Sequence, residues 1–112
     1  MIFKDKKDWP NKYDINKLIT RKNDIQKILN GHKSTIRRND RYADIGDEIT
    51  FDDHTFIISN IYQQQLKTIT EDDAKFEGYT SLDEYKEALT SIHQGAVWDP
   101  EVIVWTHELK KK

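Results

Sequence analysis

Two segments rich in β-branched and aromatic residues, joined by a pair of aspartates, limit the folds open to this chain. Residues 49–51 predict a strand that ends at Asp52-Asp53, a dipeptide typical of a tight hairpin turn. Residues 54–62 continue as a second strand that is apolar on both faces. Because strands in a barrel wall are covered on both faces, we expect this second strand to be central rather than at an edge.

A short helix is predicted before this hairpin. Asn23 is its expected N-cap, apolar residues recur at helical spacing over residues 25–29, and Asn30-Gly31 is expected to end it. Residues 34–38 then predict a strand, and a polar loop around residues 39–47 follows, with a turn at its end. Residues 1–20 show no sustained hydrophobic period, so we expect them to lie over the surface as an extended N-terminal arm.

Two consecutive helices are predicted after the hairpin. Thr70 with Asp73 indicates the start of the first helix, and Gly78 can end it. Ser81 with Glu84 forms a capping box for the second. The second helix has an apolar stripe at helical spacing, which consists of Leu82, Tyr85, Leu89 and Ile92.

The end of the chain returns to strand. Residues 93–95 are expected to end the last helix, residues 98–100 to form a turn, and residues 102–109 to form a strand before a solvated tail at residues 110–112. In a chain of 112 residues this order predicts one α+β domain over residues 1–112. We expect a small mixed β-barrel whose helices plug or flank its ends.

The composition excludes several classes of site. There is no cysteine, so disulfides, thiolate metal sites and cysteine nucleophiles are absent, and an intracellular setting fits. No apolar run is long enough for a signal peptide or a membrane span, so we expect a cytoplasmic protein with no membrane partner. The four histidines lack the short spacings of a zinc site, and no Gly-rich phosphate loop occurs; neither a metal nor a cofactor is expected.

The net charge of −2 hides an uneven distribution. Residues 1–42 carry twelve Lys or Arg residues against five Asp or Glu, whereas residues 43–107 carry three against fourteen. Arg37, Arg38 and Arg41 lie almost together in the basic part, and such a cluster attracts phosphate groups. The alternative is that both parts are solvated surfaces that neutralise each other in the folded protein.

The stretch GHKSTIRR at residues 31–38 resembles the signature Gly-x-Lys-x-x-Glu-x-Arg of the ASCH domain family, whose fold is a PUA-like barrel. Four segments further along the chain are also similar to ASCH sequences: residues 41–47, 71–79, 81–85 and 104–108. The resemblance covers residues 20–109 and implies an ASCH-type barrel. It also implies binding of RNA or of a modified nucleoside or nucleotide, because the family is thought to bind such ligands.

Some small family members resemble amidohydrolases that deacetylate N4-acetylcytidine with Lys, Thr and Glu residues. Lys33 and Glu77 match the lysine and the glutamate, but Ile36 stands at the position of the threonine and has no proton to give. In an enzyme, either Ser34 or an activated water is expected to replace the threonine. Ser34 shares a strand face with Ile36, whereas Thr35 is expected on the opposite face. The implied catalytic residues are Lys33, Glu77 and Ser34.

Charged residues around the same motif are candidate ligand contacts. Arg38 matches the family arginine, and we expect it inside the cleft with Lys33 and Glu77. Since successive strand residues point to opposite faces, Arg37 is then expected outside, with Arg41, as an outer phosphate contact. Glu77 lies at the end of a predicted helix, where the helix dipole disfavours an anion, so it should pair with Lys33 or Arg38 in a functional or a purely structural ion pair.

Aromatic residues supply the remaining candidates. Tyr42, Tyr79, Trp98 and Trp105 could stack on a nucleobase, but aromatic residues are more often core, and Trp105 is the one we most expect to be buried.

Three functions follow. The leading hypothesis is an RNA- or nucleotide-binding domain that holds a base or a single-stranded segment in a polar cleft, as a monomer or weak homodimer. The alternatives are an amidohydrolase acting on an acylated nucleoside such as N4-acetylcytidine, and a protein-interaction domain.

Overall fold

The computed structural model describes residues 5–92 and 98–112. Its helices and strands follow the chain as three 3-10 helices, η1 (Lys6–Asp8), η2 (Ile15–Lys17) and η3 (Leu66–Thr68), the α-helices α1 (Lys22–Leu29), α2 (Glu71–Phe76) and α3 (Leu82–Ile92), and the strands β1 (Thr35–Arg38), β2 (Glu48–Phe51), β3 (His54–Gln65) and β4 (Ile103–Lys111).

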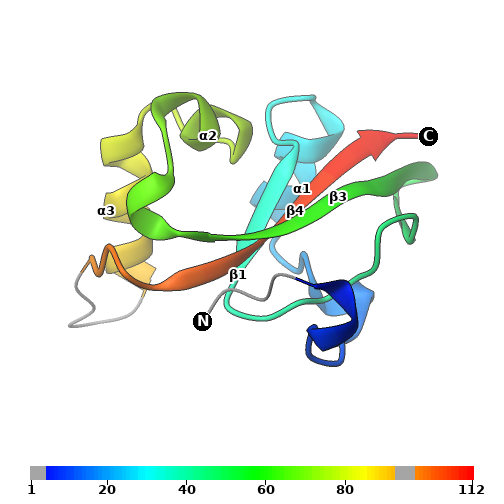
Figure 1. Cartoon of the computed structure of the whole chain (residues 1–112). Coiled ribbons are helices and arrows are strands. Elements are labelled where there is room, and N and C mark those ends of the chain that lie inside the picture. The colour runs from blue at the N-terminus through cyan, green and yellow to red at the C-terminus, as the bar shows by residue number, and fades with distance from the viewer. Residues whose placement is uncertain (1–4, 93–97) are drawn as a thin grey trace.

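The four strands form one curled sheet in the order β1-β4-β3-β2, and all three pairings are antiparallel (Figure 1). The sheet is an open half-barrel in which the long strand β3 lies between β4 and β2, so the prediction of a central strand is confirmed. Asp52 and Asp53 have φ of 47° and 66°, as the predicted hairpin turn requires. The α+β class with flanking helices is confirmed.

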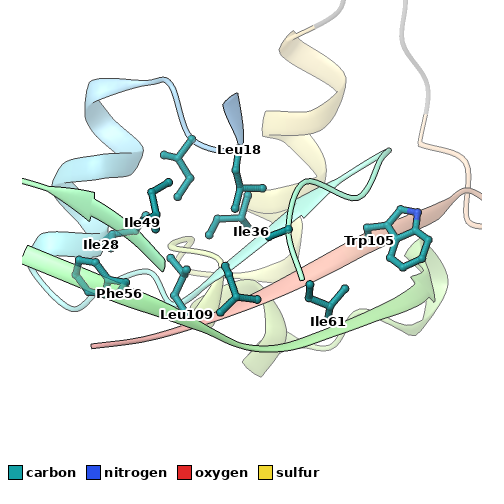
Figure 2. Close-up of a cluster of buried hydrophobic side chains, with 11 residues drawn as sticks. Leu18, Ile28, Ile36, Ile49, Phe56, Ile61, Trp105 and Leu109 are labelled. Atoms are coloured by element: carbon teal, nitrogen blue, oxygen red, sulfur yellow. The ribbon is translucent and has the colours of Figure 1, made fainter. Parts of the chain in front are cut away.

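One face of the sheet packs on the larger hydrophobic cluster. Trp105 and Leu109 of β4, four positions apart, share this face with Ile36 of β1, and Figure 2 shows their side chains among those of α1 and β3. Leu18, which precedes α1, is fully buried in the same cluster. The expected burial of Trp105 is therefore confirmed, with 4% of its surface exposed.

The opposite face of the sheet is partly covered by α2 and α3. Val104, the neighbour of Trp105, points to this face and packs with Ala74 of α2 and Tyr85 of α3. Leu82 and Leu89 of the predicted apolar stripe pack on the same cluster, whereas the side chain of Ile92 and the expected helix end at residues 93–95 lie outside the described residues. Figure 1 shows α2 and α3 together at one end of the sheet.

The N-terminal segment differs from the expected extended arm. It contains η1 and η2, and it buries Leu18 and Ile19 in the core. The indole of Trp9 packs edge-on against Trp105 with 5.1 Å between ring centroids. The large side chains of this segment supply apolar area that α1 alone does not, which is why the segment packs instead of lying solvated.

Helix ends and the C-terminus test the local predictions. The N-cap of α1 is Arg21, so the prediction of Asn23 was wrong: the helix begins one residue before it. Thr70 and Asp73 form the predicted capping box of α2. Ser81 accepts a hydrogen bond from the Glu84 N–H at the start of α3. Residues 110–112 are exposed, but β4 continues to Lys111 rather than ending before a free tail.

Candidate functional site

The site begins where α2 meets β1. Glu77 is the C-cap of α2, and Gly78 with φ of 97° turns the chain away from the helix axis. The backbone carbonyl of Phe76 accepts a hydrogen bond from the Ser34 N–H, which fixes the end of α2 beside the start of β1. The Glu77 side chain therefore reaches the face of β1 that points away from the large core.

Lys33 and Glu77 meet, as the sequence predicted. The Lys33 Nζ donates to the backbone carbonyl of Glu77 at 2.7 Å and to its Oε2 at 3.3 Å. Both side chains are buried, with 5% and 6% of their surface exposed. The lysine thus compensates both the carboxylate and one of the carbonyl groups left free at the end of α2.

Two further residues on the same face of β1 bind Glu77. The Thr35 hydroxyl donates to Oε1 at 2.6 Å, and the Arg37 Nη1 donates to the same oxygen at 2.8 Å. The backbone N–H of Arg37 donates to Oε2 at 3.0 Å. Lys33, Thr35 and Arg37 are spaced by two residues, so strand alternation places all three on one side.

The Glu77 carboxylate is saturated by these contacts. A carboxylate offers about four lone-pair sites, and each Glu77 oxygen accepts two hydrogen bonds: Thr35 and Arg37 on Oε1, Lys33 and the Arg37 N–H on Oε2. A ligand donor can reach this carboxylate only if one of these bonds breaks. Glu77 is the centre of a buried network that orients its cations.

Arg37 is buried rather than outside, so its expected role as an outer contact was wrong. Its side chain is 1% exposed, and its Nε donates to Gln64 Oε1 at 2.9 Å. Its Nη2 is buried without a hydrogen-bond partner, and an Asp73 carboxylate oxygen lies 3.7 Å away. Lys33 lies on the face that turns toward Glu77. Arg37 lies on the same face as Lys33, whereas Arg38 does not.

Arg38 is half-buried and bound elsewhere. Its Nε and Nη2 donate to the backbone carbonyl of Leu18 at 3.0 and 2.6 Å, so it does not pair with Glu77. Arg37 and Arg38 nevertheless both line the main cavity, contrary to the expectation that only one could. Because β1 is an edge strand, side chains from either of its faces can border a cavity beside it.

The main cavity, of about 330 Å³, opens beside this network. Its polar lining consists of Arg21, Asp24, Lys33, Arg37, Arg38, Asn39 and Glu77. Its apolar and aromatic lining consists of Ile36, Leu66, Tyr79, Tyr85, Leu89, Val102 and Val104. An apolar wall with a few convergent polar groups is typical of a small-molecule site, and the volume lies at the lower end of that class.

Two tyrosines form the aromatic part of the wall. Burial raises the pKa of the Tyr79 and Tyr85 hydroxyls, and the nearby Glu77 charge raises it further. Both hydroxyls therefore stay protonated near neutral pH and can donate hydrogen bonds. The Lys27 ammonium lies 5.1 Å from the centroid of the Tyr79 ring and holds that ring at the rim.

The other predicted contacts lie away from the cavity. Arg41 is buried, binds the Pro10 carbonyl and Asp44, and lies over the Trp9 ring, so its expected exposure as an outer phosphate contact was wrong. The hydrogen bonds of its guanidinium group therefore hold the N-terminal segment in place. Tyr42 packs on the large core cluster and Trp98 on the smaller one; neither lines the main cavity.

The hydroxyl beside Glu77 comes from Thr35, not from Ser34. Among the described residues the Ser34 hydroxyl makes no hydrogen bond with Lys33 or Glu77, and Ser34 does not line the main cavity. Thr35 itself does not line the main cavity and stands behind Glu77. Sequence reasoning also missed Gln64 and Thr106, which extend the network: the Thr106 hydroxyl donates to Gln64 Oε1 at 2.9 Å.

No cluster of three or more His, Asp or Glu side chains in residues 5–92 and 98–112 could hold a metal ion. Among the same residues, no helix has the length and apolar character needed to cross a membrane.

Comparisons with known proteins identify the fold. A scan of protein-family models finds no match, and a search of curated proteins finds no relative. The crystal structure of an ASCH domain from Lactobacillus crispatus JV V101 matches 79% of this chain and 69% of that one, with a TM-score of 0.63 and 18% identity. A DUF984 protein from Enterococcus faecalis V583 matches 78% of this chain and 65% of its own, with a TM-score of 0.53 and 15% identity.

At these identities the similarity concerns the fold. The match covers 79% of this chain, and the expected PUA-like architecture is confirmed. This chain has the fold of an ASCH domain.

Proposed function

We propose that the main cavity binds a nucleoside or nucleotide unit, either free or as part of a single-stranded RNA. The fold, which is that of an ASCH domain, and a cavity with one aromatic and one cationic wall support this proposal. Nucleobases combine a planar apolar ring with polar edge groups, so they suit such a cavity.

The observation that carries the proposal is the unpartnered Arg37 Nη2. Arg37 borders the cavity, and its buried Nη2 has no hydrogen-bond partner, with an Asp73 carboxylate oxygen 3.7 Å away; a buried donor without a hydrogen bond costs stability. Because Nη2 is not exposed, a ligand oxygen binds it only after the Arg37 side chain turns toward the cavity; in that position the ligand restores the missing bond. The Lys33 ammonium, which has three donors and uses two of them on Glu77, can offer its third to the same ligand.

The polar wall offers more donors than acceptors. The Glu77 oxygens are fully used, whereas Lys33, Arg37 and Arg38 all border the cavity, and the lining carries four cations against two anions. The expected contact from Glu77 to an exocyclic amine is therefore unfavourable. A base carbonyl or a phosphate oxygen is the group that fits this wall.

Binding is tested by calorimetric titration with the four ribonucleoside 5′-monophosphates and the four nucleosides. We expect at least one to bind, and Arg37→Lys to weaken it at least tenfold, because lysine keeps a charge near Glu77 but lacks the second terminal nitrogen. Lys67→Gln, which removes an exposed ion pair outside the cavity, is the control and should bind as the unchanged protein does. Absence of binding by all eight compounds would refute the proposal.

A second candidate function is hydrolysis of an acylated nucleoside, and the Thr35 position favours it. The family's hydrolases use a lysine, a residue with a hydroxyl group and a glutamate. The same three residue types meet here, because Lys33 and Thr35 both donate hydrogen bonds to the Glu77 carboxylate. Because Thr35 stands behind Glu77, the attacking group in this scheme is a water: its oxygen bonds to the acyl carbon, the carbonyl oxygen becomes an oxyanion beside Lys33, and the carbon–nitrogen bond then breaks. Glu77 takes the water proton and passes it to the leaving amine.

This activity requires Glu77 to release one of its four donors first, which makes it the less direct function of the two. Incubation with N4-acetylcytidine and chromatography for cytidine test it. Release that persists in Lys33→Ala and Glu77→Gln proteins would remove these residues from any catalytic role.

A further inference from the structure

A second hollow, of about 280 Å³, lies on the other side of the Glu77 network. It is lined by Ser34, Thr35, Ser59, Phe76, Glu108, Leu109 and Lys110. Thr35 lines this hollow, Glu77 lines the main cavity, and a hydrogen bond joins the two side chains. The two hollows are neighbours across a single pair of side chains.

The end of α2 serves both hollows. Glu77 borders the main cavity, and the preceding residue, Phe76, borders the second hollow with 55% of its surface exposed. Its backbone carbonyl is bound by the Ser34 N–H, so the ring is attached to a fixed point of the fold. A phenyl ring that is held at the rim of a hollow and left in water is available for stacking.

The floor of the second hollow contains an irregularity in the sheet. The register between β3 and β4 shifts between Ile58 and Asn60, which leaves Ser59 as an extra residue. Its hydroxyl donates to the backbone carbonyl of Glu108 at 3.3 Å. Bulges often re-aim a side chain beside a site, and this one lies at the hollow that Phe76 also lines.

The remaining polar groups of the second hollow do not select one particular ligand. Ser34 and Ser59 offer hydroxyls, which can either donate or accept, and Lys110 offers a cation. Glu108 also lines this hollow, which therefore contains one anion as well as one cation. An aromatic face, two hydroxyls and a cation suit a ring linked to a phosphate, without selecting one base.

We propose that the second hollow receives the nucleotide next to the one in the main cavity, with its base stacked on Phe76 and its phosphate near Lys110. This inference rests on the proposed function and extends it: the ligand is a single strand of at least two nucleotides rather than an isolated nucleotide. Stacking on an aromatic side chain adds affinity for any base, so the second position contributes little sequence specificity.

The test compares one nucleotide with two. The monophosphate that binds best is titrated against the unchanged protein, followed by dinucleotides that add each of the four bases to it. We expect the dinucleotides to bind about tenfold more tightly, since stacking on an aromatic side chain typically contributes a factor of about 5 to 150. In Phe76→Ala the gain should disappear while the affinity for the monophosphate stays, and in Phe76→Tyr the gain should persist.

Tyr13→Ala is the matched control. Tyr13 is an aromatic residue of similar exposure, 57%, that lines neither hollow, so its replacement should keep the gain. Equal affinity for one and two nucleotides, or a gain that survives Phe76→Ala, would overturn the inference and leave the proposed function intact. Failure of every mononucleotide and nucleoside to bind would instead overturn the proposed function itself.

Discussion

The Thr35 hydroxyl donates a 2.6 Å hydrogen bond to Glu77, 42 residues further along the chain. A threonine thus stands beside the lysine and the glutamate, although the motif spacing assigned that position to Ile36. Ile36 instead packs in the large core cluster. The polar face of β1 therefore contains Lys33, Thr35 and Arg37, and its apolar face contains Ile36.

The first prediction concerns the charge of Glu77. Glu77→Gln leaves the buried cations Lys33 and Arg37 without their anion, so the free energy of unfolding should fall by about 3 kcal/mol. Urea denaturation followed by circular dichroism measures this change. Glu87→Gln, which alters an exposed glutamate of α3, should change stability by less than about 0.5 kcal/mol. Equal effects of the two substitutions would mean that the network contributes no net stability.

A second prediction separates orientation from direct contact at Thr35. Thr35→Val removes the hydroxyl with little change in volume, so a Glu77 oxygen and the Arg37 Nη1 each lose a partner. Stability should fall by about 1–2 kcal/mol, the cost of a buried polar group left unsatisfied. Nucleotide affinity should change less than about threefold, because Thr35 does not line the main cavity. Thr35→Ser should restore most of the stability; a large loss of affinity in Thr35→Val would contradict this role.

Local sequence signals predicted much of the fold. The Asp52-Asp53 turn, the capping box of Thr70 and the glycine end of α2 depend on neighbouring residues only, and all three are present. The N-terminal segment was misjudged because its fold depends on distant partners. Trp9 packs against Trp105 and Leu18 enters the core, and neither contact has a signal in the segment itself.

The candidate site was predicted only in part, because some of its contacts also depend on residues that are distant in the sequence. Lys33 and Glu77 were paired correctly, since an anion at a helix end needs a cation. Arg38 was preferred to Arg37 from the motif spacing, although strand alternation from Lys33 places Thr35 and Arg37 on its face. That alternation was the signal that could have found both residues. The cavity beside an edge strand required coordinates, because one sequence does not reveal strand order.

A third prediction uses two glycines with nearly equal backbone geometry. Gly78 and Gly46 have φ of 97° and 95°, so alanine at either position costs about 1–2 kcal/mol in backbone strain. A Cβ at Gly78 would also lie 3.1 Å from the Lys27 Cδ and 3.4 Å from the Lys33 Cβ, whereas none lies within 4 Å at Gly46. Gly78→Ala should therefore be the more destabilising by about 0.5–1 kcal/mol and should weaken nucleotide binding. Gly46→Ala should leave binding unchanged; identical binding by both variants would oppose this account.

His107 links the sheet to the loop after β1. Its ring is fully buried, its Nε2 accepts a hydrogen bond from the Tyr42 N–H at 3.1 Å, and its Nδ1 lies 3.1 Å from the Ile36 carbonyl oxygen. These partners require a neutral ring with the proton on Nδ1. Protonation of Nε2 would remove the acceptor for Tyr42 and place a charge in the core.

The fourth prediction is that His107 makes the protein less stable in mild acid. Burial lowers the pKa of His107 in the folded protein below the ordinary value of about 6.5 that it has when unfolded. Between these two values the unfolded state binds the additional proton, so the stabilisation is complete above about pH 6.5 and is lost as the pH falls toward and through the lower pKa. Melting temperatures between about pH 7.5 and 5 measure this loss. His107→Gln should flatten the profile, whereas His54→Gln, at an exposed histidine, should retain it.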